Sequence, residues 1–221
     1  MPKKLTEEQM AGIIDTGIRE FADKGYENAN TNVIAKKAGV SVGYLFKTYG
    51  DKRGFFTACL EKSLQALTDA ISSCDTAGKK PGEKARALIR TTIEFSRAHD
   101  DYIRMYYEVT VLRDRDLTKE MADRIEGISA KAYAAIIEKG QQEGILRKDL
   151  PAKKAAYLFD NIMMMLQFSF AGDYYKERYR VYTGLEPDDP AGDEALIGQV
   201  MDFLRAALGA ESVKKSRKKS K

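Results

Sequence analysis

Several residue types that mark other classes of protein are rare or missing. The 221 residues include no Trp, one His, two Cys and five Pro. A single His (His99) and two separated Cys (Cys59 and Cys74) supply neither the Cys/His cluster of a zinc site nor the spacing of a disulfide framework. The chain also lacks a Glu-x-x-His motif and a glycine-rich phosphate loop. We therefore expect a protein that is not an enzyme and that uses no cofactor or metal.

Long apolar runs are missing as well. The most apolar stretch, residues 155–172, is interrupted by Asp160, Asn161 and Gln167, whereas a membrane span needs roughly 18 apolar residues in a row. The first ten residues are charged and contain no apolar core of a secretory signal. These absences predict a cytoplasmic protein that has no membrane partner and keeps its thiols reduced.

What is abundant favours helices. Hydrophobic residues make up 43% and charged residues 32% of the chain, and the frequent Ala, Leu, Lys, Glu, Arg and Met predict an all-α fold. The net charge of +4 is unevenly spread: +2 over residues 1–53, −3 over 54–210 and +5 over 211–221. A basic front suits contact with nucleic acid. The basic tail either adds to that contact or only solvates the chain.

Start and stop signals divide the chain into helices. Thr6 and Gln9 form a capping box, and Gly25 ends the first helix. Apolar periodicity then predicts helices over residues 31–38, 42–49, 52–73, 82–98, 101–112, 118–143, 151–171 and 193–208. We expect Thr118 and Asp193 to cap two of them. Residues 173–192 carry the weakest helical signal.

The second and third of these segments fit a helix-turn-helix. Ala35 falls where the two helices cross, and Gly39 falls in the turn, where a positive φ is needed. Val40 and Leu45 fill the space between the helices, and Ser41 caps the second one. Such a pair projects its second helix into the DNA major groove.

Further residues extend this pattern on both sides of the turn. They are Phe21, Gly25, Tyr26, Ile34, Ala35, Gly39, Val40, Ser41, Gly43, Leu45, Tyr49 and Lys52. Together they resemble the DNA-binding domain of the TetR family of bacterial transcriptional regulators over residues 13–56. The resemblance implies a helix-turn-helix DNA-binding domain in residues 1–53 and a helical effector-binding and dimerisation domain in 54–210, followed by a disordered tail in 211–221.

The resemblance also implies which residues meet DNA. The expected contacts are Thr31, Lys37, Ser41, Val42, Gly43, Tyr44, Lys47, Thr48, Tyr49 and Lys52. Thr31 should cap its helix and reach a phosphate, and Lys52 should pair with a phosphate at a helix start. Phe46 departs from the family, which usually has a phosphate-binding Tyr there. The alternative for Tyr44 and Phe46 is that one or both pack inward, Phe46 more readily than Tyr44.

A single motif of this size binds DNA weakly, so we expect a homodimer on a double-stranded, pseudo-palindromic operator. The two most apolar late helices are the candidate interface, because a helix that is apolar on all sides must be covered on all sides. Its expected residues are Tyr157, Leu158, Met165, Leu196, Val200, Phe203, Leu204 and Ala207.

The family commonly holds a small effector among its middle helices. The candidate contacts here are Tyr102, Met105, Tyr106, Val109, Tyr133, Ile137, Met163, Leu166, Gln167 and Phe170. This lining suits an apolar or aromatic compound, although the same stripes also suit an ordinary core. Effector binding would move the helix that begins at Lys52 and so release DNA. Repression is adopted from the resemblance.

Two other functions remain open. The first is a TetR-like DNA-binding protein that has no small ligand and is controlled by a protein partner. The second is a helical adaptor that binds no DNA.

Overall fold

The computed structural model of the chain describes residues 5–73 and 81–210, and all its regular elements are helices. They are α1 (Glu7–Asn28), α2 (Thr31–Lys37), α3 (Val42–Tyr49), α4 (Lys52–Ser72), α5 (Pro81–Ala98), α6 (Asp100–Thr110), α7 (Arg115–Gln142), α8 (Ala152–Ser169), α9 (Asp173–Thr183), the 3-10 turn η1 (Pro190–Gly192) and α10 (Asp193–Leu208). The predicted all-α fold is confirmed. Cys74 and the predicted basic tail lie outside the described residues.

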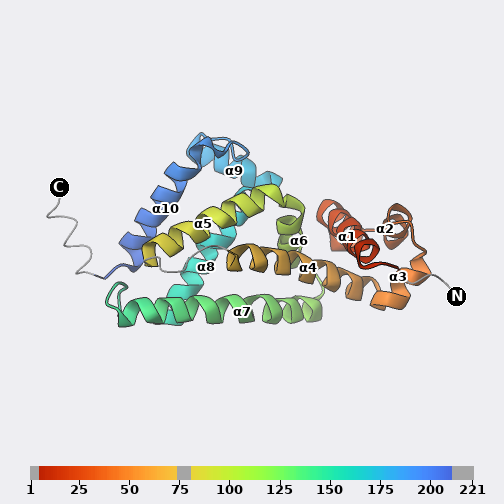
Figure 1. Cartoon of the computed structure of the whole chain (residues 1–221), viewed down its shortest axis with the longest axis horizontal. Coiled ribbons are helices and arrows are strands. Elements are labelled where there is room, and N and C mark those ends of the chain that lie inside the picture. Colours follow the sequence, from red (N-terminus) through yellow and green to blue (C-terminus); the bar gives the residue numbers. More distant parts are fainter. Residues whose placement is uncertain (1–4, 74–80, 211–221) are drawn as a thin grey trace.

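The helices form an elongated molecule with a small front and a larger body (Figure 1). Helices α1–α3 make up the front, and α5–α10 make up most of the body. Helix α4 begins beside α3 and runs into the body, so it packs against α1, α3, α5 and α6. Helix α6 also packs against α1. The front is therefore held by two helices that continue into the body.

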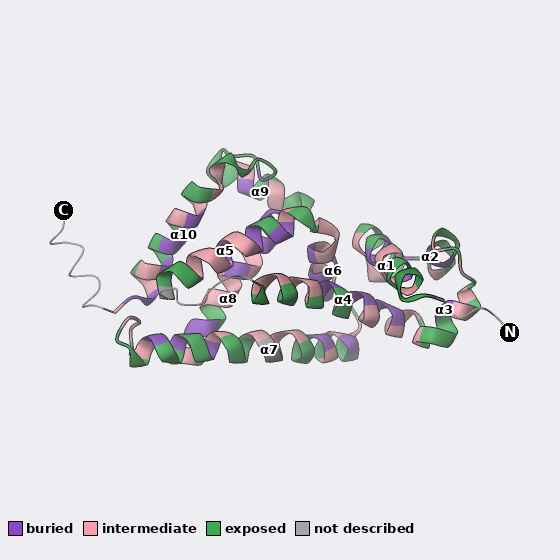
Figure 2. Cartoon of the chain, viewed as in Figure 1, coloured by how far each residue is buried: buried purple, intermediate pink, exposed green. Residues whose placement is uncertain are grey.

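The core of the front is aromatic. Phe21 of α1 meets Phe56 of α4 edge to face, with ring centroids 5.1 Å apart, and the ring centroid of Phe55 lies 5.9 Å from that of Phe21. All three rings are fully buried. The buried residues of α4 lie in its first half, where it crosses α1 (Figure 2). This packing anchors α2 and α3, since helices of seven and eight residues do not persist alone.

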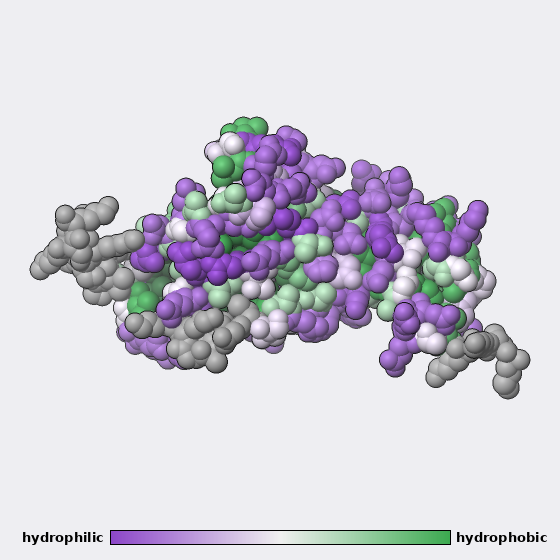
Figure 3. Space-filling model, turned by 45° about the horizontal axis from the view of Figure 1, so that its top comes forward, coloured by the Kyte–Doolittle hydropathy of each residue, from purple (hydrophilic) through white to green (hydrophobic). Residues whose placement is uncertain are grey.

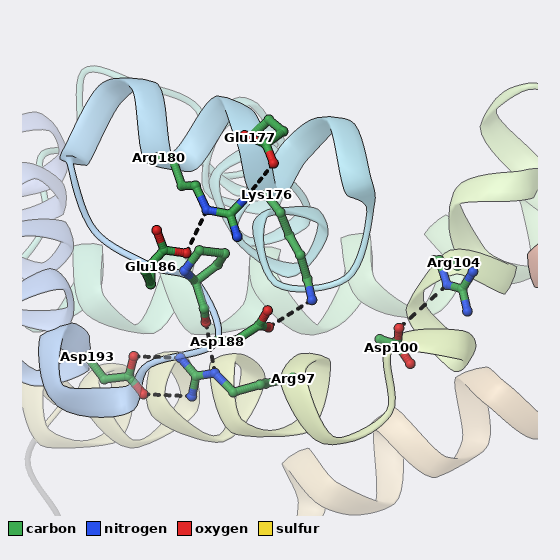
Figure 4. A network of polar contacts seen from close by, with 10 residues as sticks. Arg97, Asp100, Arg104, Lys176, Glu177, Arg180, Glu186, Asp188 and Asp193 are labelled. Carbon is green, nitrogen blue, oxygen red and sulfur yellow. Dashed lines mark hydrogen bonds and ion pairs between the residues drawn. The ribbon is translucent and has the colours of Figure 1, made fainter.

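In the body, α5 lies centrally between α4, α8 and α10. Its Arg97 forms a two-pronged ion pair with Asp193 at the start of α10, at 2.8 and 2.9 Å, and donates to the Pro187 carbonyl (Figure 4). Lys176 and Arg180 of α9 pair with Asp188 and Glu186 of the connection that follows. These contacts order residues 173–192, which contain α9 and η1, although the sequence signal there is weak.

The predicted helix starts are partly correct. The Thr6–Gln9 capping box is present, and Ser41 caps α3. Thr31 does not cap α2, because the preceding Asn30 accepts from the Asn32 amide instead. Nor does Thr118 cap α7: Asp114 accepts from the Leu117 amide and starts the helix earlier.

Asp193 also differs from its predicted role. It is the first residue of α10 rather than its cap, and its carboxylate is engaged by Arg97.

The face of the molecule shown in Figure 3 is mostly hydrophilic, with separate hydrophobic areas among the polar residues. No described helix is long and apolar enough to span a bilayer.

The α1–α4 crossing yields a stability prediction. A methyl group on Gly17 would lie 2.5 Å from Phe55 Cζ and 2.7 Å from Cys59 Sγ, which is closer than atoms can pack. We expect Gly17→Ala to lower the free energy of unfolding by about 1–3 kcal/mol through overpacking, measured by urea denaturation. Gly12→Ala in the same helix is the control, because nothing lies within 4 Å of the added atom. Equal effects at the two positions would contradict this packing.

Candidate functional site

The turn between α2 and α3 is built as a helix-turn-helix requires. Gly39 has φ +70°, a left-handed conformation that suits Gly. The next amide, of Val40, donates to the Ala35 carbonyl at 3.0 Å. Ser41 Oγ then accepts from the Tyr44 amide at 3.1 Å and starts α3. Leu45 is fully buried beneath the turn, so one face of α3 is fixed to the front.

The opposite face of α3 is open. Gly43, Phe46, Lys47 and Thr48 are exposed, and Val42 is partly exposed. Among the described residues no ion pair engages Lys47. Thr48 Oγ1 donates to the Tyr44 carbonyl at 2.9 Å, within its own helix. An exposed helix face with a free amine and little negative charge is suited to a DNA groove.

The aromatic residues of α3 are arranged differently from the expectation. Tyr44 points towards α1, where its hydroxyl lies 3.2 Å from Met10 Sδ, while Phe46 is 37% exposed. The expectation that Phe46 packs inward more readily than Tyr44 is therefore wrong. Tyr49 packs 4.9 Å from the Phe55 ring, and burial raises its pKa. Its ring supports the α3–α4 junction.

The predicted phosphate ligands lie around α3. Lys37 pairs with Glu20 at 2.9 Å, yet its side chain remains 60% exposed. Lys52 donates to the Glu27 carbonyl at 3.0 Å and lies over the Tyr26 ring. Lys52 is thus held at the end of α1.

Thr31 is partly exposed at the start of α2. The prediction missed Asn30, which caps α2; the strong preference of Asn for this position is the signal that identifies it.

Polar contacts join the front to the body. Glu108 of α6 accepts from the Tyr26 amide at 3.1 Å, next to Gly25, which breaks α1 with φ +73°. Arg104 pairs with Asp23 at 2.9 Å. Farther along, Arg53 of α4 pairs with Glu120 of α7 at 2.8 Å. A shift of α6 or α7 would therefore act directly on α1 and α4.

The predicted effector residues do not form one lining. Met105 and Val109 belong to the core shared with α1 and α4, and the Tyr102 hydroxyl donates to Asp15 of α1 at 3.2 Å. Positions 102, 105 and 109 lie on the side of α6 that meets α1. Tyr106 lies on the face that meets α8. The remaining residues lie in the body: Tyr133, Ile137, Met163, Leu166, Gln167 and Phe170.

One polar group of side chains lies between α6, α7 and α8. Tyr106 donates to Glu126 at 3.2 Å, and Asp160 and Tyr133 lie close enough to interact electrostatically with Glu126. Burial and Glu126 raise the pKa of Asp160 to about 6. Burial, followed by Asp160, raises the pKa of Tyr133 to about 12. The effector prediction omitted Asp160 and Glu126, although a carboxylate inside an apolar helix is itself a signal.

The predicted dimer residues divide by exposure. Tyr157 and Leu158 of α8 are 68% and 50% exposed, and Phe203 of α10 is 61% exposed. Leu196, Val200, Ala207 and Met165 are partly buried, whereas Leu204 is buried in the body. Large apolar side chains thus face outward on both predicted helices.

No group of three or more His, Cys, Asp or Glu side chains in residues 5–73 and 81–210 is arranged to hold a metal ion. His99 precedes α6 and packs 4.6 Å from the Phe95 ring.

The raised pKa of Asp160 predicts a stability change with pH. The folded protein holds the proton to about pH 6, but the unfolded chain loses it near 3.8. Stability from this group is therefore greatest below pH 4 and is lost as the pH rises through 6. We expect Asp160→Asn to raise the free energy of unfolding at pH 7.5 by about 1 kcal/mol, allowing for solvent screening of a half-buried group.

Denaturation at several pH values measures this effect. The gain should shrink as the pH falls towards 4. Glu138→Gln, at an exposed position of α7, is the control and should change little. A gain that is the same at pH 4.5 and pH 7.5 would contradict the assignment.

Comparison with known proteins agrees with this geometry. Residues 13–59 match the family model described as bacterial regulatory proteins, tetR family. Nucleoid occlusion factor SlmA of Actinobacillus pleuropneumoniae serotype 5b is 26% identical over 140 residues, which cover 62% of this chain and 69% of SlmA.

Solved structures extend the likeness to the body. The fatty acid degradation regulator FadR of Bacillus halodurans superposes with a TM-score of 0.69 at 18% identity, over 91% of this chain and 96% of FadR. AibR, solved with isovaleryl coenzyme A and operator DNA, superposes with a TM-score of 0.66 at 19% identity, over 89% and 97%. The helix-turn-helix of residues 13–59 thus matches the TetR family of bacterial transcriptional regulators, and the chain as a whole is similar in fold to FadR and AibR.

Proposed function

We propose that the protein is a ligand-responsive repressor that binds a pseudo-palindromic operator as a homodimer and is released by a small effector. The exposed face of α3, held by the Ser41 cap and the buried Leu45, is the observation that carries DNA binding. Operator DNA is the partner seen with AibR, which has the same fold. We infer that it acts in the cytoplasm, where the DNA of a bacterium lies.

The proposed DNA contacts follow from exposure. Lys47 and Thr48 are exposed on α3 and reach phosphate or base edges, while Gly43 permits close approach of the helix. Lys37 remains exposed beside its partner Glu20 and is a phosphate contact. Selectivity then depends partly on DNA shape, because α3 has few side chains that read bases.

The domain division at residue 53 stays a prediction. Helix α4 contributes Phe55 and Leu60 to the front core, and Leu67 to the body.

Removing the α3 amine tests the DNA interface. We expect Lys47→Ala to weaken binding to duplex DNA. The slope of log K against log salt concentration should become shallower by about 1, the value expected for the loss of one phosphate contact. The operator would be selected from a random DNA pool and binding measured by fluorescence anisotropy at several salt concentrations. Lys139→Ala, on an exposed part of α7, is the control. An unchanged salt slope in Lys47→Ala would show that Lys47 of α3 does not contact DNA.

The proposed dimer uses the outward faces of α8 and α10. Tyr157, Leu158 and Phe203 are large apolar side chains that are at least half exposed in the single chain. Covering them with a second copy would remove apolar surface from water. Two copies would also supply the two recognition helices that a palindromic operator needs.

A charge on this surface should separate the copies. We expect Phe203→Glu combined with Tyr157→Glu to shift the sedimentation of the protein from dimer to monomer, and operator affinity to fall with it. Val181→Glu places the same charge on α9, where the side chain is 82% exposed outside the proposed interface. If the double variant sediments like the wild type, α8 and α10 do not form the dimer.

The proposed switch has two routes from the body to α3. The first is α4, as the sequence suggested, because α4 packs against both α3 and α5. The second is α6, whose Glu108 and Arg104 contact α1 directly. An effector between α6, α7 and α8 that is bound more tightly in one arrangement of these helices would shift α1 and α4 together.

A second function remains a candidate. SlmA is named a nucleoid occlusion factor, so its similarity favours keeping the alternative of a DNA-binding protein that has no small ligand and is controlled by a protein partner. Selection of bound DNA together with titration of small compounds separates the two. A compound that changes operator affinity supports the effector proposal, whereas DNA binding that responds to no compound supports the partner.

A further inference from the structure

The polar group between α6, α7 and α8 has an unusual composition. We call Tyr106, Glu126, Tyr133, Asp160 and Gln167 the acidic cluster. The Tyr106 hydroxyl lies 3.2 Å from Glu126 Oε1, and Ser129 Oγ lies 3.4 Å from Glu126 Oε2. Asp160 faces Glu126 from α8. Three helices thus bring two carboxylates and two phenols together.

No positive charge balances these carboxylates. Burial raises the pKa values of Asp160, Tyr106 and Tyr133. The charges that raise them further are those of Glu126 and of one another, and no Lys, Arg or His contributes. Among the described residues no ion pair involves Glu126 or Asp160. The partly buried carboxylate of Asp193, by contrast, is paired with Arg97, and that of Glu108 accepts from the Tyr26 amide. Two carboxylates without a cation are costly in a half-buried place.

A second, independent feature points to a missing hydrogen-bond donor. Gln167 is 7% exposed, and its Oε1 has no hydrogen-bond partner among the described residues. It lies seven residues after Asp160, on the same face of α8 as Met164. The Tyr106 hydroxyl lies 3.4 Å from Met164 Sδ. The unpartnered carbonyl therefore lies on the face of α8 that carries the cluster.

Aromatic rings and a Met side chain surround the acidic cluster. Tyr133 meets Phe159 edge to face at 5.1 Å, and Tyr106 lies 5.6 Å from Phe168. Glu126, Tyr133, Asp160 and Met164 remain partly exposed, so solvent reaches the cluster along the seam between α7 and α8.

We propose that the acidic cluster is the effector site and that it takes an organic cation: a protonated or quaternary amine on an apolar or aromatic body. Glu126 and Asp160 would balance the charge, and the Tyr rings would contribute cation–π contact. Gln167 Oε1 would accept from the N–H of a protonated amine, whereas a quaternary amine, which has no N–H, would use the carboxylates and rings alone. A hard metal ion fits poorly, because it prefers six or more oxygens rather than rings and a thioether. This inference rests on the proposed ligand-responsive function.

The site is also placed to act on DNA binding. Tyr106 follows Met105 in α6 and points about 100° away from it around the helix, and Met105 is fully buried in the core shared with α1. A cation drawn between Glu126 and Asp160 would change the Tyr106 contact and therefore the position of α6. Because Glu108 of α6 holds the Tyr26 amide, the change would reach the helix that supports α2 and α3.

Matched probes test the charge requirement in the full-length protein. Benzyltrimethylammonium, its uncharged carbon isostere neopentylbenzene and the anion benzenesulfonate would be compared, followed by the protonated amine benzyldimethylammonium, which supplies one N–H, and by longer-chain quaternary amines. Binding would be measured by calorimetry and by tyrosine fluorescence. We expect a quaternary amine to bind at least tenfold more tightly than its isostere, and Glu126→Gln or Asp160→Asn to lower its affinity at least tenfold. Glu138→Gln, on the same helix as Glu126, should bind like the wild type.

The pH dependence gives a readout that a folding defect would not produce. A quaternary amine does not titrate, so a rise in affinity between pH 5 and pH 7 reports ionisation of Asp160, facing Glu126 and Tyr133 of α7 and Tyr106 of α6. Asp160→Asn should abolish that rise. Equal binding of the isostere, unchanged affinity in both variants, or no binding by any amine of the series would overturn the inference.

Operator binding is measured separately on the same protein. Release of operator by the bound amine supports the effector role, and an amine that binds without changing operator affinity overturns it. A protein that binds the amine but no duplex DNA would instead refute the proposed function and leave the cation site standing.

Discussion

The close crossing of α1 and α4 at Gly17 is the constraint on which the rest of the front depends. The absence of a side chain lets Phe55 and Cys59 approach the α1 backbone, and this approach brings Phe21, Phe55 and Phe56 into one core. Helices α2 and α3 are too short to hold their own shape, so they are ordered by packing against that core. Because α4 continues into the body, any movement of α4 there would act on α3 through the same crossing.

Helix α6 is a second connection between the front and the body. Its side chains pack in two directions. Met105 and Val109 belong to the core of the front, and Tyr106 packs with α8. Glu108 then binds the Tyr26 amide beside Gly25, the left-handed break in α1. A helix with one face against α8 and the other against α1 would couple the proposed effector site to the front by contact. A close-packed core transmits the displacement of one helix to its neighbours. Coupling through α6 therefore does not require any loop to change its conformation.

Much of the front could be predicted from local sequence, because its signals are local. The turn at Gly39, the Ser41 cap and the capping box at Thr6 each depend on a few neighbouring residues. The side on which Tyr44 packs depends on Met10, 34 residues away, and no pattern within α3 contains that contact. The effector prediction grouped apolar residues without assigning them to helix faces, so it merged Met105 and Tyr106. Asp160 was visible as an interruption of an apolar stretch, but its neighbour Glu126 is brought to it only by the packing of α7 on α8.

The energy that a switch needs sets a limit on what the acidic cluster must supply. Moving a two-state equilibrium from 99:1 to 1:99 takes roughly 5.5 kcal/mol of differential binding. In a homodimer with two sites, each ligand would provide about half, which corresponds to roughly a hundredfold difference in affinity between the two states. One charge-assisted contact together with a cation–π contact is of that size. Cation binding at Tyr106, Glu126 and Asp160 would therefore supply enough free energy to release DNA only if the sites of both protomers are occupied. Release that needs two ligands responds more steeply to effector concentration than release that needs one.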